Sequence, residues 1–485
     1  MYYNTIEKLY ISYGGSMKLY NTLTKTVEEF VPHESGKVKM YTCGPTVYHY
    51  AHIGNLRSYM MEDVLEKYLR FAGYDVKRAM NITDVGHLTS DADTGEDKML
   101  KGAKREHKTV MQVAQFYTDA FFADCDSLNI KKPEIVQPAT GCIDDFIRVI
   151  SALIDKGYAY VAGGNVYFDT SKSENYGELA GHADNTENLM VGVRDDVGED
   201  ENKKNKSDFA LWFTKSKFDE QELKWDSPWG VGYPGWHIEC SCISMKYLGE
   251  YLDIHCGGVD NIFPHHTNEI AQSEAYLGHK WCGYWFHVQH LNDETGKMSK
   301  SKGEFLTVSL LKSKGYDPLA YRYFCLQSHY RKPLTFSFAS LDNAAAAYSK
   351  RYARVAATER TGEIDEEKVK ALLRGFDDAM SNDLNTSLAV TSLYDILKSD
   401  ATGAEKRAAI DAIDSVLSLG LKDATVKKEE PAAEEGDPAI LEKIAERAAA
   451  KKAKDYAKAD AIRAELLAQG IVLIDTPNGT TYKKQ

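Results

Sequence analysis

The sequence predicts an α/β fold, with a parallel sheet in its first two thirds and helices after it. Two observations lead to this prediction. Short apolar runs such as Lys37–Thr42 are followed by a glycine-bearing loop and then by a helical pattern, which is the order of a βαβ unit. After about Thr335, alanine, leucine, lysine and glutamate dominate and recur with a helical period, which is typical of a helical bundle.

The first βαβ unit lies between residues 37 and 82. Its first strand, Lys37–Thr42, alternates apolar and polar residues and stops at Gly44-Pro45. After Gly54, apolar residues recur at three- and four-residue steps until Gly73, which predicts a helix, and a second strand follows near Val76–Ile82.

A second unit follows later in the chain. Leu252–His255 is typical of a strand, Gly257-Gly258 of a tight turn, Pro264–Gly278 of a helix, and Phe286–Val288 of another strand. Two such units predict a Rossmann-like parallel sheet. The strongly charged stretch Arg194–Asp208 lies between them and indicates an exposed insertion.

The C-terminal part carries three further patterns. Helical periodicity runs from Leu341 to Leu421, and a charged, alanine-rich linker without a core pattern follows at 422–438. The last residues predict one helix, Pro438–Gln469, which Gly470 ends, and then a hairpin of Ile471–Ile474 with Thr480–Lys483.

The composition excludes several classes of protein. With 485 residues, 43% of them hydrophobic and 27% charged, the chain is neither disordered nor a disulfide miniprotein. No apolar stretch approaches the roughly 18 residues of a membrane span, and Met1–Ser16 lacks the apolar core of a secretory signal. Eight scattered cysteines are too few for a disulfide scaffold, so we expect free thiols, a cytoplasmic location and no membrane.

The net charge of −13 argues against a protein that coats nucleic acid indiscriminately. The charge is unevenly distributed, however. Residues 439–485 hold nine Lys or Arg against six Asp or Glu, a net of +3, and Lys297, Lys300 and Lys302 form a second basic group. Specific binding of a polyanion through local basic surfaces therefore remains open.

Two motifs have the composition of a nucleotide site. Cys43-Gly44-Pro45 and His52-Ile53-Gly54-Asn55 flank a strand-to-helix junction, where a glycine allows close approach and a helix N-terminus favours phosphate. A plain turn with a surface histidine is the alternative. Gly296–Gly303 carries Lys297 and Lys300 between glycines, as in a cationic loop that closes over a triphosphate. A solvated surface loop is the alternative there.

Two further groups offer ligand chemistry. Cys43, Cys240, His265 and Glu269 are residue types that bind zinc, and the last two are four residues apart on one predicted helix face. From spacing alone, a helix start satisfied by hydrogen bonds is the commoner explanation of His265. Trp236 is suited to the wall of a small pocket and Asp260, after a glycine turn, to a ribose, but a core tryptophan and a turn aspartate are the alternatives.

Taken together, these motifs resemble the cysteinyl-tRNA synthetase family of class I aminoacyl-tRNA synthetases. The resemblance runs from about Met17 to Lys484. Its class signatures are a HIGH-type tetrapeptide at His52–Asn55, with Asn55 in place of the last histidine, and an intact KMSKS at Lys297–Ser301. Its cysteine-specific parts are Tyr41–Gly44, Gly235–Ser241 and Phe263–Glu269.

The resemblance implies a two-step reaction in which L-cysteine and MgATP give cysteinyl-adenylate, which then reacts with the 3′ end of tRNA(Cys). It implies a monomer with one Zn²⁺ per subunit, where the zinc selects the substrate thiol. The implied residues fall into four groups: catalytic His52, Asn55, Lys297 and Lys300; ATP-binding His52, Gly54, Asn55, Gly258, Asp260, Lys297, Met298, Ser299 and Lys300; cysteine-binding Cys43, Gly44, Thr46, Trp236 and His237; and zinc-binding Cys43, Cys240, His265 and Glu269.

The resemblance also implies a division of the chain into functional parts. In order these are an N-terminal extension (1–16), the first half of a Rossmann-like catalytic domain (17–125), a connective insertion (126–208), the second half of the catalytic domain (209–295), the KMSKS loop and stem-contact region (296–340), a helical anticodon-binding bundle (341–421), the linker (422–438) and a small C-terminal tRNA-binding α+β module (439–485).

Two other functions are compatible with parts of the pattern. A ligase that joins cysteine to an amino-sugar, of the mycothiol type, would share the zinc and nucleotide residues but needs no anticodon-binding bundle. A catalytically inactive RNA-binding paralogue would keep the fold, but decay should strike residues such as His52 or Lys297, and these are intact.

Overall fold

The computed structural model describes residues 17–85, 109–181, 200–215, 222–293, 296–297, 305–426, 438–452, 455–476 and 479–484. The chain divides into two compact units, residues 1–424 and residues 425–485.

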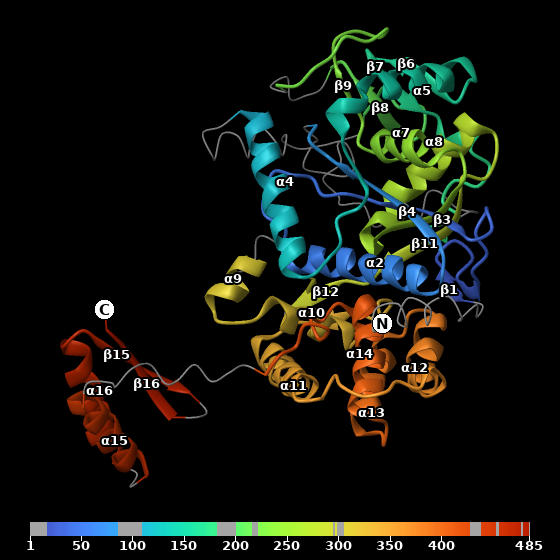
Figure 1. Cartoon of the computed structure of the whole chain (residues 1–485). Coiled ribbons are helices and arrows are strands. Elements are labelled where there is room, and N and C mark those ends of the chain that lie inside the picture. Colours follow the sequence, from blue (N-terminus) through green and yellow to red (C-terminus); the bar gives the residue numbers. More distant parts are fainter. Residues whose placement is uncertain are drawn as a thin grey trace. The chain divides into compact units, whose positions relative to one another are not determined.

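The first unit is built on a five-stranded sheet with the strand order β11-β10-β3-β4-β5 (Figure 1). Every neighbouring pair in it is parallel. Its strands are β3 (Lys37–Thr42), β4 (Asp75–Ile82), β5 (Ile135–Pro138), β10 (Leu252–Gly258) and β11 (Cys282–Val288). The predicted Rossmann-like parallel sheet is therefore confirmed.

The direction in which the chain crosses the sheet reverses between β3 and β10. From β3 the chain passes through α2 (Ile53–Phe71) to β4, and then through α4 (Val110–Ser127) to β5. From β10 it passes through α8 (Thr267–Leu277) to β11 on the opposite edge. The carboxyl ends of β3 and β10 thus lie side by side at a topological switch point, which is where open α/β sheets bind their ligands.

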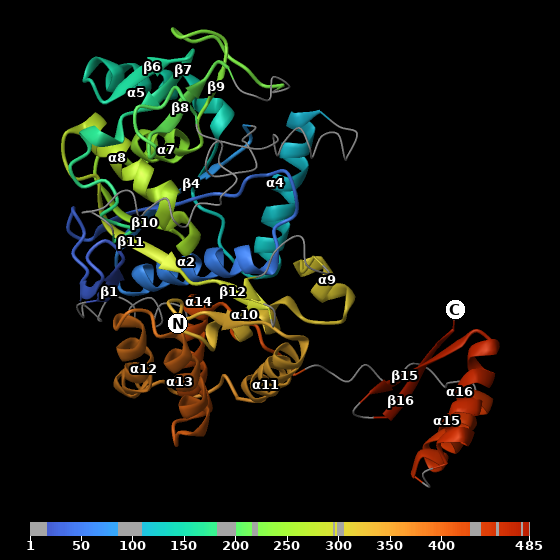
Figure 2. The same cartoon turned by 180° about the vertical axis from the view of Figure 1, so that it is seen from behind.

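Apolar side chains bury both faces of this sheet. Met40 and Ile254 belong to the same buried cluster as the inner face of α2. Tyr41 and Trp285, whose side chains point the other way in the pleat, belong to the cluster that includes α7 (His237–Leu248) and α8. Figures 1 and 2 show α2 on one side of the sheet and α7 and α8 on the other.

A four-stranded antiparallel sheet interrupts the parallel one. Its strand order is β6-β7-β8-β9, and α5 (Ile143–Asp155) precedes it. The strands are β6 (Ala159–Ala162), β7 (Asn165–Phe168), β8 (Phe209–Phe213) and β9 (Tyr233–Pro234). The observed limits differ from the expected insertion at 126–208, because β5 lies inside that range but in the parallel sheet, and β8 lies after it but in the antiparallel sheet. A short buried apolar run has the same pattern in either sheet.

A short hairpin of β1 (Lys18–Asn21) and β2 (Thr26–Glu29) covers the β11 edge of the parallel sheet. The side-chain amide of Asn21 in β1 binds the backbone of β11 through both its nitrogen and its oxygen. Its Nδ2 donates to the carbonyl oxygen of Gly283 at 3.0 Å, and its Oδ1 accepts from the backbone N–H of Trp285 at 3.1 Å. The exposed edge of β11 is thereby occupied.

The remainder of the first unit is mainly helical. It begins with a small sheet of β12 (Leu291–Asp293), β13 (Gly296–Lys297) and β14 (Leu334–Thr335). Two helices, α9 (Val308–Ser313) and α10 (Pro318–Leu326), lie between β13 and β14 in the sequence. Four more follow β14: α11 (Phe338–Ala356), α12 (Glu366–Ser381), α13 (Thr386–Lys398) and α14 (Gly403–Leu417). The predicted helical stretch from 341 to 421 is confirmed. Its helix starts carry side-chain caps, among them a capping box of Thr402 and Glu405.

The second unit consists of α15 (Pro438–Lys452), α16 (Tyr456–Ala468) and a hairpin of β15 (Ile471–Thr476) with β16 (Gly479–Lys484). The predicted hairpin is confirmed, but the prediction of one helix over 438–469 is wrong. A new helix starts after Asp455, whose side chain accepts a hydrogen bond from the N–H of Lys458 as an N-cap. Among the described helices of both units, none combines the length and the apolar composition that crossing a bilayer requires.

Candidate active site

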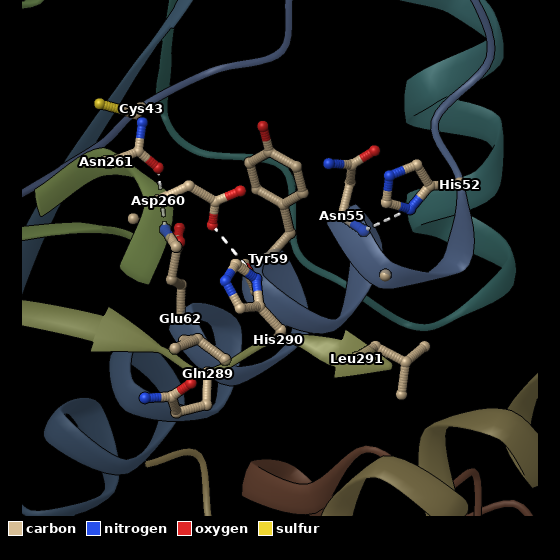
Figure 3. A pocket seen from close by; sticks show the side chains of 15 residues that line it. Cys43, His52, Asn55, Tyr59, Glu62, Asp260, Asn261, Gln289, His290 and Leu291 are labelled. Atoms are coloured by element: carbon tan, nitrogen blue, oxygen red, sulfur yellow. Dashed lines mark hydrogen bonds and ion pairs between the residues drawn. The ribbon is translucent and has the colours of Figure 1, made fainter. Parts of the chain in front are cut away.

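A pocket opens at the switch point of the parallel sheet (Figure 3). Its wall combines the first turns of α2 with residues at and just after the carboxyl ends of β3, β10 and β11. The lining residues are Cys43, His52, Gly54, Asn55, Ser58, Tyr59, Glu62, Gly257, Gly258, Asp260, Asn261, Val288, Gln289, His290 and Leu291. Residues that the sequence assigned to nucleotide binding, among them His52, Asn55 and Asp260, therefore meet in one place.

One wall of the pocket is the N-terminus of α2. His52 is the N-cap residue, and its Nδ1 accepts a hydrogen bond from the N–H of Asn55 at 3.1 Å. A Cβ at Gly54 would lie 2.9 Å from the His52 ring, so any side chain there would displace the ring of the N-cap residue. The N–H groups of the first turn and the helix dipole favour an anion at this wall.

The opposite wall carries Asp260 and His290. Asp260 Oδ1 lies 3.4 Å from His290 Nδ1, and Figure 3 shows this pair facing the space in front of Asn55. Asn261 accepts a hydrogen bond from the N–H of Gly258 at 3.0 Å, which fixes the turn that presents Asp260. An exposed carboxylate after a glycine turn is suited to accept hydrogen bonds from sugar hydroxyls.

Glu62 lies at the buried base of the pocket. Its carboxylate is 3.4 Å from Arg78, which also approaches Glu66 at 3.3 Å. Burial raises the pKa of Glu62 to about 7, and the charge of Arg78 offsets only part of that effect. The base of the pocket therefore holds a carboxyl group that changes its protonation near neutral pH.

A cluster of metal-ligand side chains adjoins the pocket through Cys43. The ligand atoms of Cys43, Cys240, His265 and Glu269 all lie within 4.8 Å of one another. Cys43 follows β3, Cys240 is on α7, His265 is in the turn before α8 and Glu269 is in the first turn of α8. The structure thus assembles the four residues that the sequence proposed as zinc ligands.

Two of the separations within this metal cluster fit the edges of a tetrahedron around a zinc ion, and the third, between His265 and Glu269, is shorter. The Sγ atoms of Cys43 and Cys240 are 3.7 Å apart, Cys240 Sγ is 3.5 Å from His265 Nε2, and His265 Nε2 is 3.0 Å from a Glu269 oxygen. With metal–ligand bonds of about 2.0–2.3 Å, the edges of a tetrahedron measure roughly 3.3–3.8 Å. The donor set of two sulfurs, one nitrogen and one oxygen is also one that zinc accepts.

Neighbouring side chains hold these ligands in place. His237 Nδ1 lies 2.9 Å from His265 Nδ1, and His255 Nε2 lies 2.8 Å from the second oxygen of Glu269. Burial alone would raise the pKa of Glu269, but His255 and His265 outweigh it and lower the pKa to about 2. Hydrogen bonds of this kind orient ligands and keep a carboxylate ionised for a metal.

A second combination of residues shares two of the same ligands. Cys43, His255, His266 and Glu269 also bring their ligand atoms within 4.8 Å of one another. In this set His266 Nε2 lies 3.2 Å from Cys43 Sγ, while His266 Nδ1 lies 2.8 Å from His287. The first set offers two sulfurs and matches the softness of zinc better.

Some predicted site residues lie outside the lining of the pocket. The N–H of Gly44 donates to Asn81 Oδ1 at 2.7 Å, and a Cβ at Gly44 would lie 1.6 Å from the carbonyl oxygen of Asn81. Thr46 forms a bridge with Thr83. The Trp236 ring lies 4.8 Å from that of His265, and His237 is buried behind His265, so both adjoin the metal cluster.

The predicted signature loop is only partly described. Gly296 and Lys297 form β13, which pairs with β12, and β12 begins at the pocket residue Leu291. Met298, Ser299 and Lys300 lie outside the described residues, as do residues 1–16.

Sequence analysis missed the supporting histidines His255, His266 and His287. They come from β10, from the turn before α8 and from β11. His266 Nδ1 lies 2.8 Å from His287 Nε2, and the rings of His255 and His266 are 4.3 Å apart. His255 and His287 each lie inside an otherwise apolar strand, and a buried histidine needs a hydrogen-bond partner. This was the signal from which a polar site beside these strands could have been predicted.

Comparisons with known proteins identify the family of the chain. The protein-family model described as the class I (C) tRNA synthetase catalytic domain matches residues 29–346 of the chain. The chain is 47% identical to the cysteine–tRNA ligase of Treponema denticola, which covers 97% of this chain and 100% of that protein. It is 44% identical to cysteine–tRNA ligase 1 of Burkholderia lata, covering 96% of each chain, and 43% identical to the cysteine–tRNA ligase of Borrelia hermsii, covering 96% of this chain and 99% of that one.

Among solved structures, a methionyl-tRNA synthetase of Mycobacterium tuberculosis in complex with methionyl-adenylate superposes with a TM-score of 0.51. The two sequences are 14% identical, and the match covers 81% of this chain and 92% of that one. This likeness supports the fold.

Proposed function

The chain belongs to the cysteine–tRNA ligase family of class I tRNA synthetases, and from this premise we propose that it joins L-cysteine to the 3′ end of tRNA(Cys) with ATP. In the first step the carboxylate of cysteine attacks the α-phosphorus of MgATP, and pyrophosphate leaves. In the second step a terminal hydroxyl of the tRNA attacks the carbonyl carbon of cysteinyl-adenylate, and AMP leaves.

One observation carries the proposal: Cys43 belongs both to the pocket at the switch point and to the metal cluster. A substrate whose thiol lies at the cluster therefore has its carboxylate directed toward the pocket that His52 and Asp260 line. Holding two reactants in one geometry replaces a bimolecular encounter with an intramolecular one, which lowers the barrier.

We assign the charge-stabilising roles to the walls of the pocket. The N–H groups at the start of α2, with His52 and Asn55, would bind the phosphates, and Asp260 with Gly258 would bind the ribose. Lys297 and Lys300 of the signature loop, with Met298 and Ser299 between them, would stabilise the leaving pyrophosphate. Phosphoryl chemistry of this type depends more on such positioning than on covalent help.

We further propose that Cys43, Cys240, His265 and Glu269 hold one Zn²⁺ per subunit. When bound, zinc supplies a coordination position that favours a thiolate over an un-ionised hydroxyl, because zinc prefers soft sulfur. A pocket that discriminates by shape alone gains only about 1–3 kcal/mol from so small a difference as that between cysteine and serine. His237 would act here by orienting His265, and Trp236 by walling the cluster.

The partners follow from this reaction: ATP, L-cysteine and tRNA(Cys). The helical bundle of α11–α14 and the second unit are extra to amino-acid activation, and we propose that they bind the tRNA. We expect a monomer that works in the cytoplasm.

Cysteine-dependent ATP–pyrophosphate exchange, followed by charging of tRNA(Cys), tests the proposal. We expect both activities, with serine more than about 200-fold poorer than cysteine in the exchange, which exceeds what shape alone supplies. Exchange without charging, together with transfer of cysteine to an amino-sugar, would favour the mycothiol type of ligase. The absence of both activities would favour an inactive RNA-binding paralogue.

A further inference from the structure

Five aromatic side chains cluster beside the entrance of the pocket. Tyr117 on α4 lies beneath the others, with the rings of Tyr50 and Phe116 edge-on to it at centroid distances of 5.1 and 5.0 Å. The His49 ring is parallel to that of Tyr117 at 6.1 Å, and Phe305 packs edge-on against His49 at 4.5 Å. His49, Tyr50, Phe116, Tyr117 and Phe305 are called the aromatic cluster below.

Part of the aromatic cluster faces solvent. Tyr117 is 3% exposed, but Tyr50 is 40% exposed and Phe116 is 39% exposed. Both lie outside the pocket lining and outside the metal cluster. Two large aromatic rings kept at the surface over a buried third ring form a small, firm apolar platform, which is a recurrent feature of binding sites.

The aromatic cluster is continuous with the pocket through one contact. The Phe305 ring lies edge-on to the ring of His52 at 6.1 Å, and His52 lines the pocket as the cap of α2. Figure 3 shows His52 at the side of the pocket that borders α4, the helix that carries Phe116 and Tyr117. A ligand that enters the pocket past His52 therefore passes the aromatic cluster.

We propose that the aromatic cluster is a stacking surface for the unpaired 3′-terminal nucleotides of the tRNA. The inference rests on the proposed function, which requires an RNA end to reach the pocket. Unpaired bases stack on aromatic side chains without regard to sequence, because every base has a π-face. Tyr50 and Phe116 supply the rings that the bases contact, and Phe305 and His49 connect this surface to His52.

Chemistry separates this occupant from the adenine of ATP. The pocket already offers the start of α2 and Asp260 for the nucleotide, and neither Tyr50 nor Phe116 lines it. Because Tyr50 and Phe116 carry no charge at neutral pH, their share of binding comes from stacking and not from counterion release. Their removal should weaken tRNA binding without changing how that binding depends on salt.

The test compares the wild-type protein with Tyr50→Ala, Phe116→Ala and the double variant. For intact tRNA(Cys) we expect the Kd to rise by roughly 5- to 150-fold for each base that loses its stacking partner. For tRNA(Cys) that lacks its unpaired 3′ nucleotides, all four proteins should bind equally. Tyr50→Phe and Phe116→Tyr should restore binding, and Met111→Ala, an exposed residue of α4 outside the aromatic cluster, is the matched control.

Cysteine-dependent ATP–pyrophosphate exchange separates the outcomes. Unchanged exchange in the variants shows that they fold and that the nucleotide pocket is intact, as the proposal requires. Equal losses for intact and truncated tRNA, or a raised KM for ATP with unchanged tRNA binding, would overturn it. Failure of the wild-type protein to charge tRNA at all would instead overturn the proposed function.

Discussion

The guanidinium of Arg57, fully buried on α2, donates a hydrogen bond to the carbonyl oxygen of His290 at 2.8 Å. It also donates to the carbonyl oxygens of Gln289 and Lys332. Gln289 and His290 line the pocket, and β12 and β13 follow them toward Lys297. A single side chain of α2, the helix that begins in the HIGH-type motif, thus fixes the backbone that leads to Lys297, the first residue of the KMSKS motif.

We expect Arg57→Met to lower both stability and activity. The change leaves several buried carbonyl groups without a donor, which should cost roughly 2–4 kcal/mol of unfolding free energy. The kcat for ATP–pyrophosphate exchange should also fall at temperatures where the variant remains folded, because β12 is no longer fixed against α2. Denaturant unfolding and exchange kinetics measure the two effects.

Arg70→Met is the control for this prediction. Arg70 is also on α2, but its side chain is 33% exposed, and it pairs with the buried Glu66 and the exposed Glu134 without contacting the backbone of Gln289 or His290. Glu66 keeps Arg78 and Lys131 as partners after this change, so we expect kcat to stay unchanged at temperatures where the variant is folded. An equal effect of the two substitutions on kcat would contradict the role given to Arg57.

We expect Cys240→Ser to lose zinc and to lose discrimination between cysteine and serine. A hydroxyl is a poorer zinc ligand than a thiolate, so the affinity for zinc should fall at least roughly tenfold. Zinc per subunit, measured by elemental analysis, and the ratio of exchange with the two amino acids give the result. Cys282→Ser, a buried free thiol outside the metal cluster, should keep both the metal and the selectivity.

We expect His255→Leu to weaken zinc binding without removing a proposed ligand. His255 holds the second oxygen of Glu269 at 2.8 Å, and loss of such a partner typically costs 10- to 100-fold in metal affinity, a range we take as roughly what to expect here. Competition with a chelator of known affinity measures it. If instead His255 belonged to the ligand set with His266, the loss should match that of Cys43→Ser, and Cys240→Ser should then retain its zinc.

Glu62 predicts a pH dependence of stability. Because burial raises its folded pKa to about 7 from an unfolded value near 4.5, the native state binds more protons than the unfolded state between these values. Glu62 therefore contributes a stability that is fully present below pH 4.5 and is lost as the pH rises through 7. Relative to wild type, Glu62→Gln should become progressively more stable from pH 5 to pH 8, in urea unfolding at each pH. A constant difference across this range would show that Glu62 does not titrate there.

Local signals predicted much of the parallel sheet. The strand Lys37–Thr42 and the helix that ends before Gly73 were predictable, because alternation, helical spacing and a glycine with positive φ act within a few residues. The assignment of β5 and β8 to their sheets was not, because a buried apolar run does not reveal which strand pairs with it. The second helix of the C-terminal module was missed because a single capping residue, Asp455, starts it.

The candidate site shows the same division. The four residues of the metal cluster were recognisable from residue type and from their match to a family pattern. His255, His266 and His287 were not, because their contacts depend on the register between β10 and β11 and on the turn before α8. The aromatic cluster likewise joins the loop before α2, the helix α4 and Phe305, which are far apart in the sequence.

The position of Cys43 in both the pocket and the metal cluster has a further consequence. If the thiol of the substrate is anchored at one end and its carboxylate must meet the nucleotide at the other, the site gauges the length of the amino acid. Homocysteine has the same thiol but one more methylene, so its carboxylate would be misplaced by about 1 Å, a displacement that can cost about a hundredfold in rate. The loop after β3, which holds Cys43, would then set the distance between the thiol and the carboxylate of the substrate. This distance would exclude homocysteine, although its thiol could bind zinc as well as that of cysteine.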